Sequence, residues 1–175
     1  MSEEENLQYR PVVCDSLIYT PGDVLEFYLP SPPSEETYDY HFFKMKKNII
    51  EGQSEKNYEE SNSYVLKILK DYFQDKNKNI EPILWENNSV ILKTNENYTG
   101  IITNLSSYTY ILCVDIEEIS RSPSFVFRNT NTPVNPSKYY GIIFPSHLTC
   151  EFMENKDDLD KIFIIGNVYL REITD

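Results

Sequence analysis

The chain has 175 residues, of which 40% are hydrophobic, and this is enough for one packed domain with or without an extension. Its formal net charge is -12. Nucleic acids and anionic membranes both attract Lys and Arg, so this charge disfavours direct RNA binding and membrane binding by the isolated chain. Only five glycines are present, which argues against Gly-rich phosphate loops.

The N-terminal residues and the cysteines indicate an intracellular protein. The acidic start, Met1 to Glu5, is unlike a signal peptide, and no apolar run approaches the roughly 20 residues of a membrane span. Three cysteines, odd in number and widely spaced, are typical of reduced thiols; they are Cys14, Cys113 and Cys150.

The N-terminal part predicts a tail and a hairpin. Residues 1–10 indicate a loose acidic tail. The β-rich runs at 16–20 and 24–29 flank the turn sequence Pro21-Gly22-Asp23, and such an arrangement favours a β-hairpin.

One amphipathic helix is expected at residues 63–74. Its apolar side chains recur at helical spacing and are Tyr64, Val65, Ile68, Leu69, Tyr72 and Phe73. Ser61 or Ser63 can cap its start. The preceding residues 35–60 are mostly polar and hold a basic cluster, which we interpret as a solvated face; its members are Lys44, Lys46 and Lys47.

The chain is β-rich after Ser89. Five segments have the alternating or continuous pattern of apolar residues that is typical of strands: 90–92, 98–105, 108–116, 139–144 and 162–170. Between Ser120 and Ser137 we expect a long loop, interrupted by a short strand at 125–127. The sequence therefore predicts a mainly β fold, α+β overall.

No pattern of residues indicates catalysis, a cofactor or a metal. His41 and His147 lie far apart, without a Cys or His at zinc spacing. Glu117 and Glu118 are adjacent on one strand and so point to opposite faces. The acidic run 157–160 is typical of a polar turn between strands. We accordingly expect that the chain is not an enzyme and carries no cofactor.

Residues 90–118 resemble the first motif of the Sm and Sm-like (LSm) family. An apolar strand ends in Leu92-Lys93, a turn follows at Thr94-Asn95, and then comes an aromatic-x-Gly, Tyr98-Thr99-Gly100. Gly100 would bend a barrel strand, and Asn95 tolerates a left-handed turn. The segment 163–170, with a turn at Gly166-Asn167, is similar to the second Sm motif.

The chain departs from the family at the residues that bind uridines. Ser106, Tyr110 and Ile165 stand where the family has its turn Asp, its base-contacting Asn and its stacking Arg. The resemblance leaves three residues as candidate nucleic-acid contacts: Tyr108, at the place of a stacking aromatic, Gly166 and Asn167.

The resemblance implies a five-stranded Sm-like barrel at residues 80–175, with residues 1–79 as an N-terminal extension that carries the hairpin and the helix. It implies a non-catalytic protein–protein assembly subunit of a ribonucleoprotein-type complex, active in RNA processing. Sm-type barrels pair edge to edge, so the expected partners are other protein subunits of the Sm-like kind. The expected interface residues are Tyr139, Tyr140, Ile142, Phe163, Ile164 and Ile165.

Two alternatives stay open from the sequence. One is a stand-alone interaction or inhibitor protein, of viral origin as one option, on an unrelated small β-barrel or sandwich. The other is an enzyme whose site the sequence does not reveal, because members of a catalytic triad can be distant in the chain.

Overall fold

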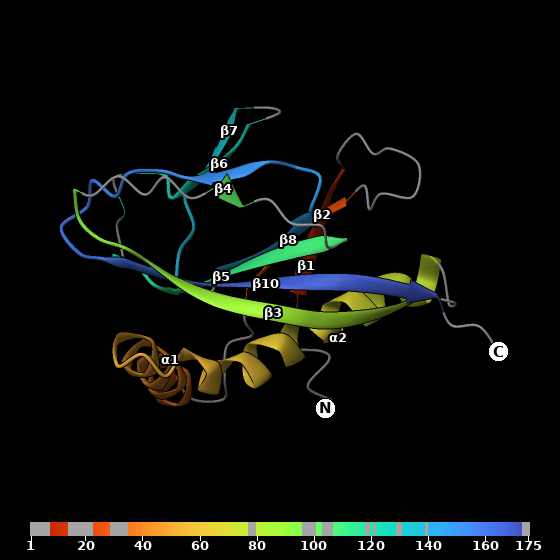
Figure 1. Ribbon diagram of the computed structural model, residues 1–175, viewed down its shortest axis with the longest axis horizontal. Coiled ribbons are helices and arrows are strands. Elements are labelled where there is room, and N and C mark those ends of the chain that lie inside the picture. The colour runs from red at the N-terminus through yellow and green to blue at the C-terminus, as the bar shows by residue number, and fades with distance from the viewer. Residues whose placement is uncertain are drawn as a thin grey trace.

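Three layers of secondary structure are stacked in the molecule: a small sheet, a large sheet and a layer of helices (Figure 1). The computed structural model describes residues 8–13, 23–28, 35–76, 80–95, 101–102, 107–117, 120, 122–128, 131–138 and 140–172. No described helix is long and apolar enough to cross a membrane.

The large sheet has six strands, and all neighbouring strands are antiparallel. In spatial order they are β1 (Gln8–Val13), β2 (Asp23–Tyr28), β8 (Tyr140–Pro145), β5 (Tyr108–Asp115), β10 (Lys161–Glu172) and β3 (Ile80–Leu92). The small sheet has four strands, in the order β4 (Ile101–Ile102), β9 (Cys150–Phe152), β6 (Phe125–Phe127) and β7 (Thr132–Val134).

The chain alternates between the two sheets from β3 onward. It visits the large sheet at β3, β5, β8 and β10, and the small sheet at β4, β6, β7 and β9. Eight antiparallel strands shared in this way between two facing sheets make a jelly roll. The hairpin of β1 and β2 extends the large sheet beyond β8.

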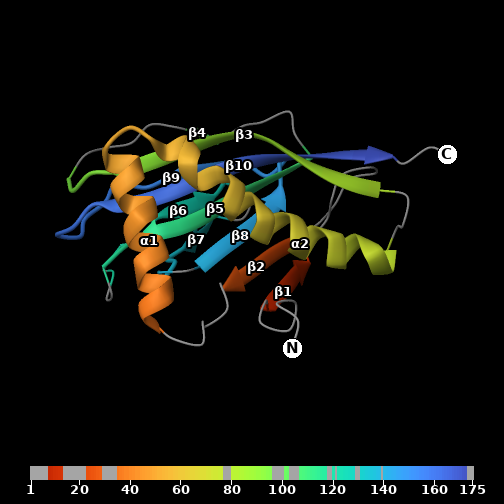
Figure 2. The same cartoon turned by 90° about the horizontal axis from the view of Figure 1, so that it is seen from below.

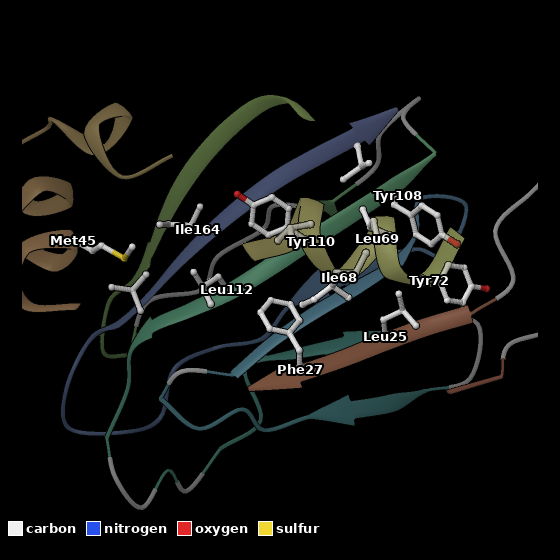
Figure 3. Close-up of a cluster of buried hydrophobic side chains, with 14 of the residues drawn as sticks. Leu25, Phe27, Met45, Ile68, Leu69, Tyr72, Tyr108, Tyr110, Leu112 and Ile164 are labelled. Atoms are coloured by element: carbon white, nitrogen blue, oxygen red, sulfur yellow. The ribbon is translucent and has the colours of Figure 1, made fainter. Parts of the chain in front are cut away.

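The helices cover the outer face of the large sheet, as the view from below shows (Figure 2). They are α1 (Glu35–Ile50), the short 3-10 helix η2 (Ser54–Asn57) and α2 (Tyr58–Lys76). The predicted apolar stripe of α2 is confirmed: all its members are buried except Tyr64, which is half-buried. Figure 3 shows Ile68, Leu69 and Tyr72 of this stripe among side chains of the sheet.

Alternate residues of the large sheet enter two separate cores. On β10, Ile162 and Ile164 point to the helices, whereas Phe163 points between the sheets. The inter-sheet core is dominated by phenylalanine rings, with edge-to-face pairs such as Phe125–Phe163 and Phe127–Phe144. The strand pattern of period two explains this division.

A buried polar network attaches α2 to the large sheet. The Tyr110 hydroxyl donates to Asn62 Oδ1 at 2.7 Å, accepts from Asn87 Nδ2 at 2.7 Å and lies 3.2 Å from Ser61 Oγ. The ring of Tyr110 lies against Gly166, where an added Cβ would come within 2.0 Å of Tyr110 Cε2. A side chain at position 166 would therefore displace the tyrosine.

Several sequence-based expectations are confirmed. The fold is mainly β and α+β, and the strands predicted at 108–116, 125–127, 139–144 and 162–170 correspond to β5, β6, β8 and β10. Asn95 has the predicted left-handed backbone, with φ of 62°. The expectations for Gly100 and for residues 16–20 lie outside the described residues.

Other expectations need correction. The five-stranded Sm-like barrel is wrong, because the described residues from 80 onward form eight strands that are divided between two sheets. Gly166-Asn167 is not a turn but part of β10, and the register shift opposite these two residues leaves Glu86 of β3 as an extra residue. The sequence also missed α1, and β1 begins at Gln8, within the predicted acidic tail. Ser61 lies inside α2, which begins at Tyr58, so it is not the cap.

Candidate functional site

The candidate site is a buried lysine at one end of the space between the two sheets. Lys161 is the first residue of β10, and its side chain is fully buried. Lysine is almost never fully buried unless it is paired, so its surroundings decide what it does. It points to the same side of β10 as Phe163, two residues on, toward the start of β6.

Three oxygens of uncharged groups accept hydrogen bonds from Lys161. Its Nζ donates to the Ser122 carbonyl at 2.8 Å, to Ser124 Oγ at 3.1 Å and to Ser122 Oγ at 3.2 Å. Both serines precede β6 directly, so the small sheet supplies these acceptors, whereas the large sheet supplies the lysine.

A buried carboxylate completes the cluster. Asp157 Oδ2 lies 3.5 Å from Lys161 Nζ and accepts a hydrogen bond of 2.6 Å from Ser120 Oγ. A charge-assisted hydrogen bond between an ammonium and a carboxylate is normally about 2.7–2.9 Å long. The ion pair is therefore a loose one, although both side chains are fully buried.

Asn155 fixes the loop that carries Asp157. Its Nδ2 donates to the carbonyls of Leu92 and Leu159, at 2.9 and 2.8 Å, and its Oδ1 accepts from the Asp157 backbone N–H at 2.9 Å. The loop between β9 and β10 is thereby attached to the end of β3. The predicted polar turn at 157–160 is in this loop, but Asp157 is not solvated as expected.

Burial governs the electrostatics of this end of the molecule. It lowers the pKa of Lys161, and the nearby Asp157 carboxylate opposes that shift. Burial also raises the pKa of the Cys113 thiol, on β5, well above its usual range. Lys161 thus gains more from a close negative charge than a solvated lysine would.

The sequence-predicted nucleic-acid contacts are not at the surface. Tyr108 is fully buried under α2, where its ring lies edge-to-face with Phe73 at a centroid distance of 6.1 Å. Gly166 and Asn167 are buried in the middle of β10. None of the three is placed where a base could stack on it.

The sequence-predicted interface strands are internal. β8 pairs with β2 and β5, and β10 pairs with β5 and β3, so neither offers a free backbone edge along its paired residues. Tyr140, Ile142, Phe163 and Ile164 are buried and Ile165 is half-buried, whereas Tyr139 lies outside the described residues. The helices and the small sheet cover the two apolar faces of β10.

Sequence reasoning missed Lys161. The available signal was its position: it directly precedes the apolar run Ile162–Ile165 and has the same strand phase as Phe163. Its spacing of four residues from Asp157 was a second signal. The acidic run 157–160 instead predicts a solvated turn.

Solved structures resemble this chain in fold. No family model and no curated protein matches it. An oxidoreductase of the 2OG-Fe(II) oxygenase family from Burkholderia pseudomallei matches 95% of this chain and 75% of its own, with 10% identity and a TM-score of 0.51.

A viral collagen prolyl hydroxylase from Paramecium Bursaria Chlorella virus-1, in complex with 2OG, matches 62% of this chain and 71% of its own. That match has 12% identity and a TM-score of 0.44. We base the fold assignment on the Burkholderia oxidoreductase, which has the higher TM-score.

Among the described residues, no side chains combine into the iron ligands usual in such oxygenases, two histidines and one carboxylate. His41 lies in α1, in the helix layer, whereas His147 is exposed in the turn between β8 and β9. Within the described ranges, no group of three His, Cys, Asp or Glu side chains could hold a metal ion. We therefore assign no step to an iron centre.

The match to the Burkholderia oxidoreductase overturns the assignment made from the sequence. The resemblance to the Sm family was wrong, and so was the function drawn from it, a ribonucleoprotein assembly subunit in RNA processing, because the fold is shared with an oxygenase-family protein. The expectation that the chain is not an enzyme is contradicted by the same match, to an oxidoreductase. What the chain has in common with that protein is the two-sheet jelly-roll fold.

Proposed function

We propose that the chain binds a small dicarboxylic acid of the 2-oxoglutarate class between its two sheets, and that Lys161 pairs with one carboxylate of that acid. The observation that carries the proposal is the fully buried Lys161 ammonium, whose described carboxylate partner lies 3.5 Å away. The family name of the Burkholderia oxidoreductase, which shares this fold, supplies the ligand class.

The surroundings of Lys161 suit a carboxylate. Hydroxyl groups can donate as well as accept, so Ser122 and Ser124 could turn from accepting the lysine's hydrogen bonds to donating to an acid. In a low-dielectric interior, a carboxylate at hydrogen-bonding distance stabilises an ammonium more than a neutral oxygen does. Burial lowers the pKa of Lys161, and the nearby carboxylate of Asp157 opposes that shift, as a bound carboxylate would.

Asp157 is the group with which such a ligand competes. Its carboxylate already lies near Lys161, and Ser120 holds it there. A dicarboxylic acid that pairs with Lys161 at closer range must displace Asp157 or share the ammonium with it. The proposal covers recognition of the acid and assigns no reaction to the bound molecule.

The test is a thermal-shift and calorimetric titration with 2-oxoglutarate. At a ligand concentration of 100 times Kd, binding should stabilise the fold by about 2.7 kcal/mol, which raises Tm by about 5–10 °C for a chain of this size. Lys161→Met should abolish this rise, whereas Lys156→Met, at an exposed lysine in the same loop, should keep it.

Circular dichroism of Lys161→Met comes first, because the variant must be folded for its titration to count. Ser124→Ala, which keeps the lysine and removes one hydroxyl partner, gives a second reading and should weaken binding. Absence of any 2-oxoglutarate effect on the wild-type chain would overturn the proposal. So would a full effect in folded Lys161→Met.

A further inference from the structure

The outer face of α1 exposes apolar side chains. Four large hydrophobic side chains are exposed among the described residues, and two of them, Phe43 and Ile50, are on α1, at 63% and 61% exposure. Met45 and Ile49 of the same helix are buried against the large sheet. Phe43, Lys47 and Ile50 have the spacing of one helix face. In Figure 2, α1 lies on the viewer's side of the sheet.

Lysines surround the two exposed apolar side chains. Lys44 and Lys47 are exposed on α1. Lys46, on the same helix, and Lys138 share a single carboxylate, Asp115, at 2.8 and 3.7 Å, and both lysine side chains are 44% exposed. Residues 43–50 contain three lysines and no acidic residue, and Glu51 follows at the end of the helix.

This positive surface stands out because the chain as a whole has a net charge of -12. The rest of the molecule is correspondingly more acidic. Charges separated by more than about 8 Å are screened at physiological ionic strength, so a small partner on α1 is little affected by the distant acids. A membrane or a long nucleic acid would bring phosphates close to those acids and be repelled.

We infer that the outer face of α1, defined by Phe43, Lys44, Lys47 and Ile50, docks an acidic segment of a partner protein in which apolar residues stand among Asp and Glu. The carboxylates pair with the lysines, and the apolar residues cover Phe43 and Ile50. The aliphatic stems of the lysines add apolar contact area.

The experiment is an NMR titration of the full chain, labelled with nitrogen-15, with a synthetic peptide in which Leu and Phe alternate with Glu and Asp. Amide shifts should concentrate at residues 43–50. Lys44→Glu with Lys47→Glu should weaken binding about tenfold or more, since exposed ion pairs of 0.2–1 kcal/mol each become repulsions. Phe43→Ser with Ile50→Ser should weaken it as well.

The matched control is Lys70→Glu with Lys156→Glu. It makes the same change in net charge at exposed lysines elsewhere, and the Kd should stay within about twofold of wild type. An equal loss in this control would show attraction to the whole molecule and overturn the inference. So would shifts outside α1, no peptide binding, or tighter binding to phosphatidylserine vesicles or an RNA oligonucleotide. Failure of 2-oxoglutarate binding leaves this inference unaffected, because α1 and Lys161 lie on opposite faces of the large sheet.

Discussion

The two faces of the large sheet are packed by different chemistry. Toward the helices, aliphatic and tyrosine side chains meet α2, and a network of amides and hydroxyls around Tyr110 fixes the helix in place. Between the sheets, phenylalanine rings fill the space, and a buried ion pair, Lys161 with Asp157, lies at one end. The polar groups around Tyr110 are neutral and have partners at 2.7–3.2 Å, whereas the fully buried ammonium on the inter-sheet side has its carboxylate at 3.5 Å. Because of this difference, we propose that the ligand binds on the inter-sheet side.

The largest effect should come from removing a ring between the sheets. Phe163→Ala should destabilise the fold by about 3–5 kcal/mol, because it leaves a cavity among Phe125, Phe152 and their neighbours. Urea denaturation measures this. Ile164 is the next residue along the strand but lies in the helix-side core, and Ile164→Val should cost about 0.5–1.5 kcal/mol. Tyr169→Ala, on the exposed side of the same strand, should cost less than Ile164→Val. Similar losses for Phe163→Ala and Tyr169→Ala would contradict the inter-sheet core.

Breaking the buried ion pair should have the next largest effect. Asp157→Asn keeps the shape of the side chain but leaves the Lys161 ammonium without its carboxylate, at a cost of about 3 kcal/mol. Asp158→Asn, at the exposed neighbouring acid, is the matched control and should change stability by less than about 0.5 kcal/mol. Equal urea midpoints for the two variants would mean that Asp157 does not support the buried lysine.

The helix-side network should be weaker than the ion pair. Tyr110→Phe removes the hydroxyl that joins Asn62, Asn87 and Ser61, and should cost about 1–2 kcal/mol in urea denaturation. Tyr58→Phe removes one half-buried hydroxyl bond, to Ser54, and should cost about 0.5 kcal/mol. A Tyr110→Phe loss as large as that of Asp157→Asn would erase the contrast between the two faces.

Alkaline pH should weaken the inter-sheet core through Cys150. Burial raises the pKa of this thiol from 9.0 to about 12, so above pH 9 the unfolded chain releases a proton that the folded chain keeps. The thiol's stabilising contribution is complete below pH 9 and is lost as the pH rises toward 12, at about 1.4 kcal/mol per unit. Between pH 8 and pH 10, the free energy of unfolding of Cys150→Ala should therefore fall by about 1.4 kcal/mol less than that of wild type. Urea denaturation under reducing conditions measures both. Parallel losses in both proteins would place the alkaline sensitivity elsewhere.

Local patterns in the sequence predicted local structure well. The apolar stripe of α2 and the alternation in β5, β8 and β10 depend on neighbours a few residues apart, so they can be read from the sequence alone. The left-handed backbone of Asn95 is equally local. The order of strands is not local. β3 and β10, the first and last strands of the jelly roll along the chain, are paired, and no pattern in either strand specifies that partner.

The Sm resemblance failed for the same reason. Turn residues and a glycine in an apolar strand are shared by many β folds, and Gly166 has another cause, the close approach of Tyr110. The candidate site was equally hidden. A lysine that follows a run of acidic residues is expected to be solvated. Lys161 is buried because the small sheet brings Ser122 and Ser124 over it, and the sequence does not show this contact.

The pairing of β3 with β10 also has a consequence for synthesis on the ribosome. Leu92 pairs with Lys161 and Ile80 with Glu172, so β3 is made long before the strand beside it. At about 5–20 residues per second, the growing chain needs roughly 3–14 seconds to extend from the end of β3 to the start of β10. During that interval both backbone edges of β3 are vacant, whereas β10 covers one of them in the folded sheet, and vacant edges recruit other chains. The nascent protein therefore has a period in which chaperone binding, or a slower ribosome, decides how much of it folds.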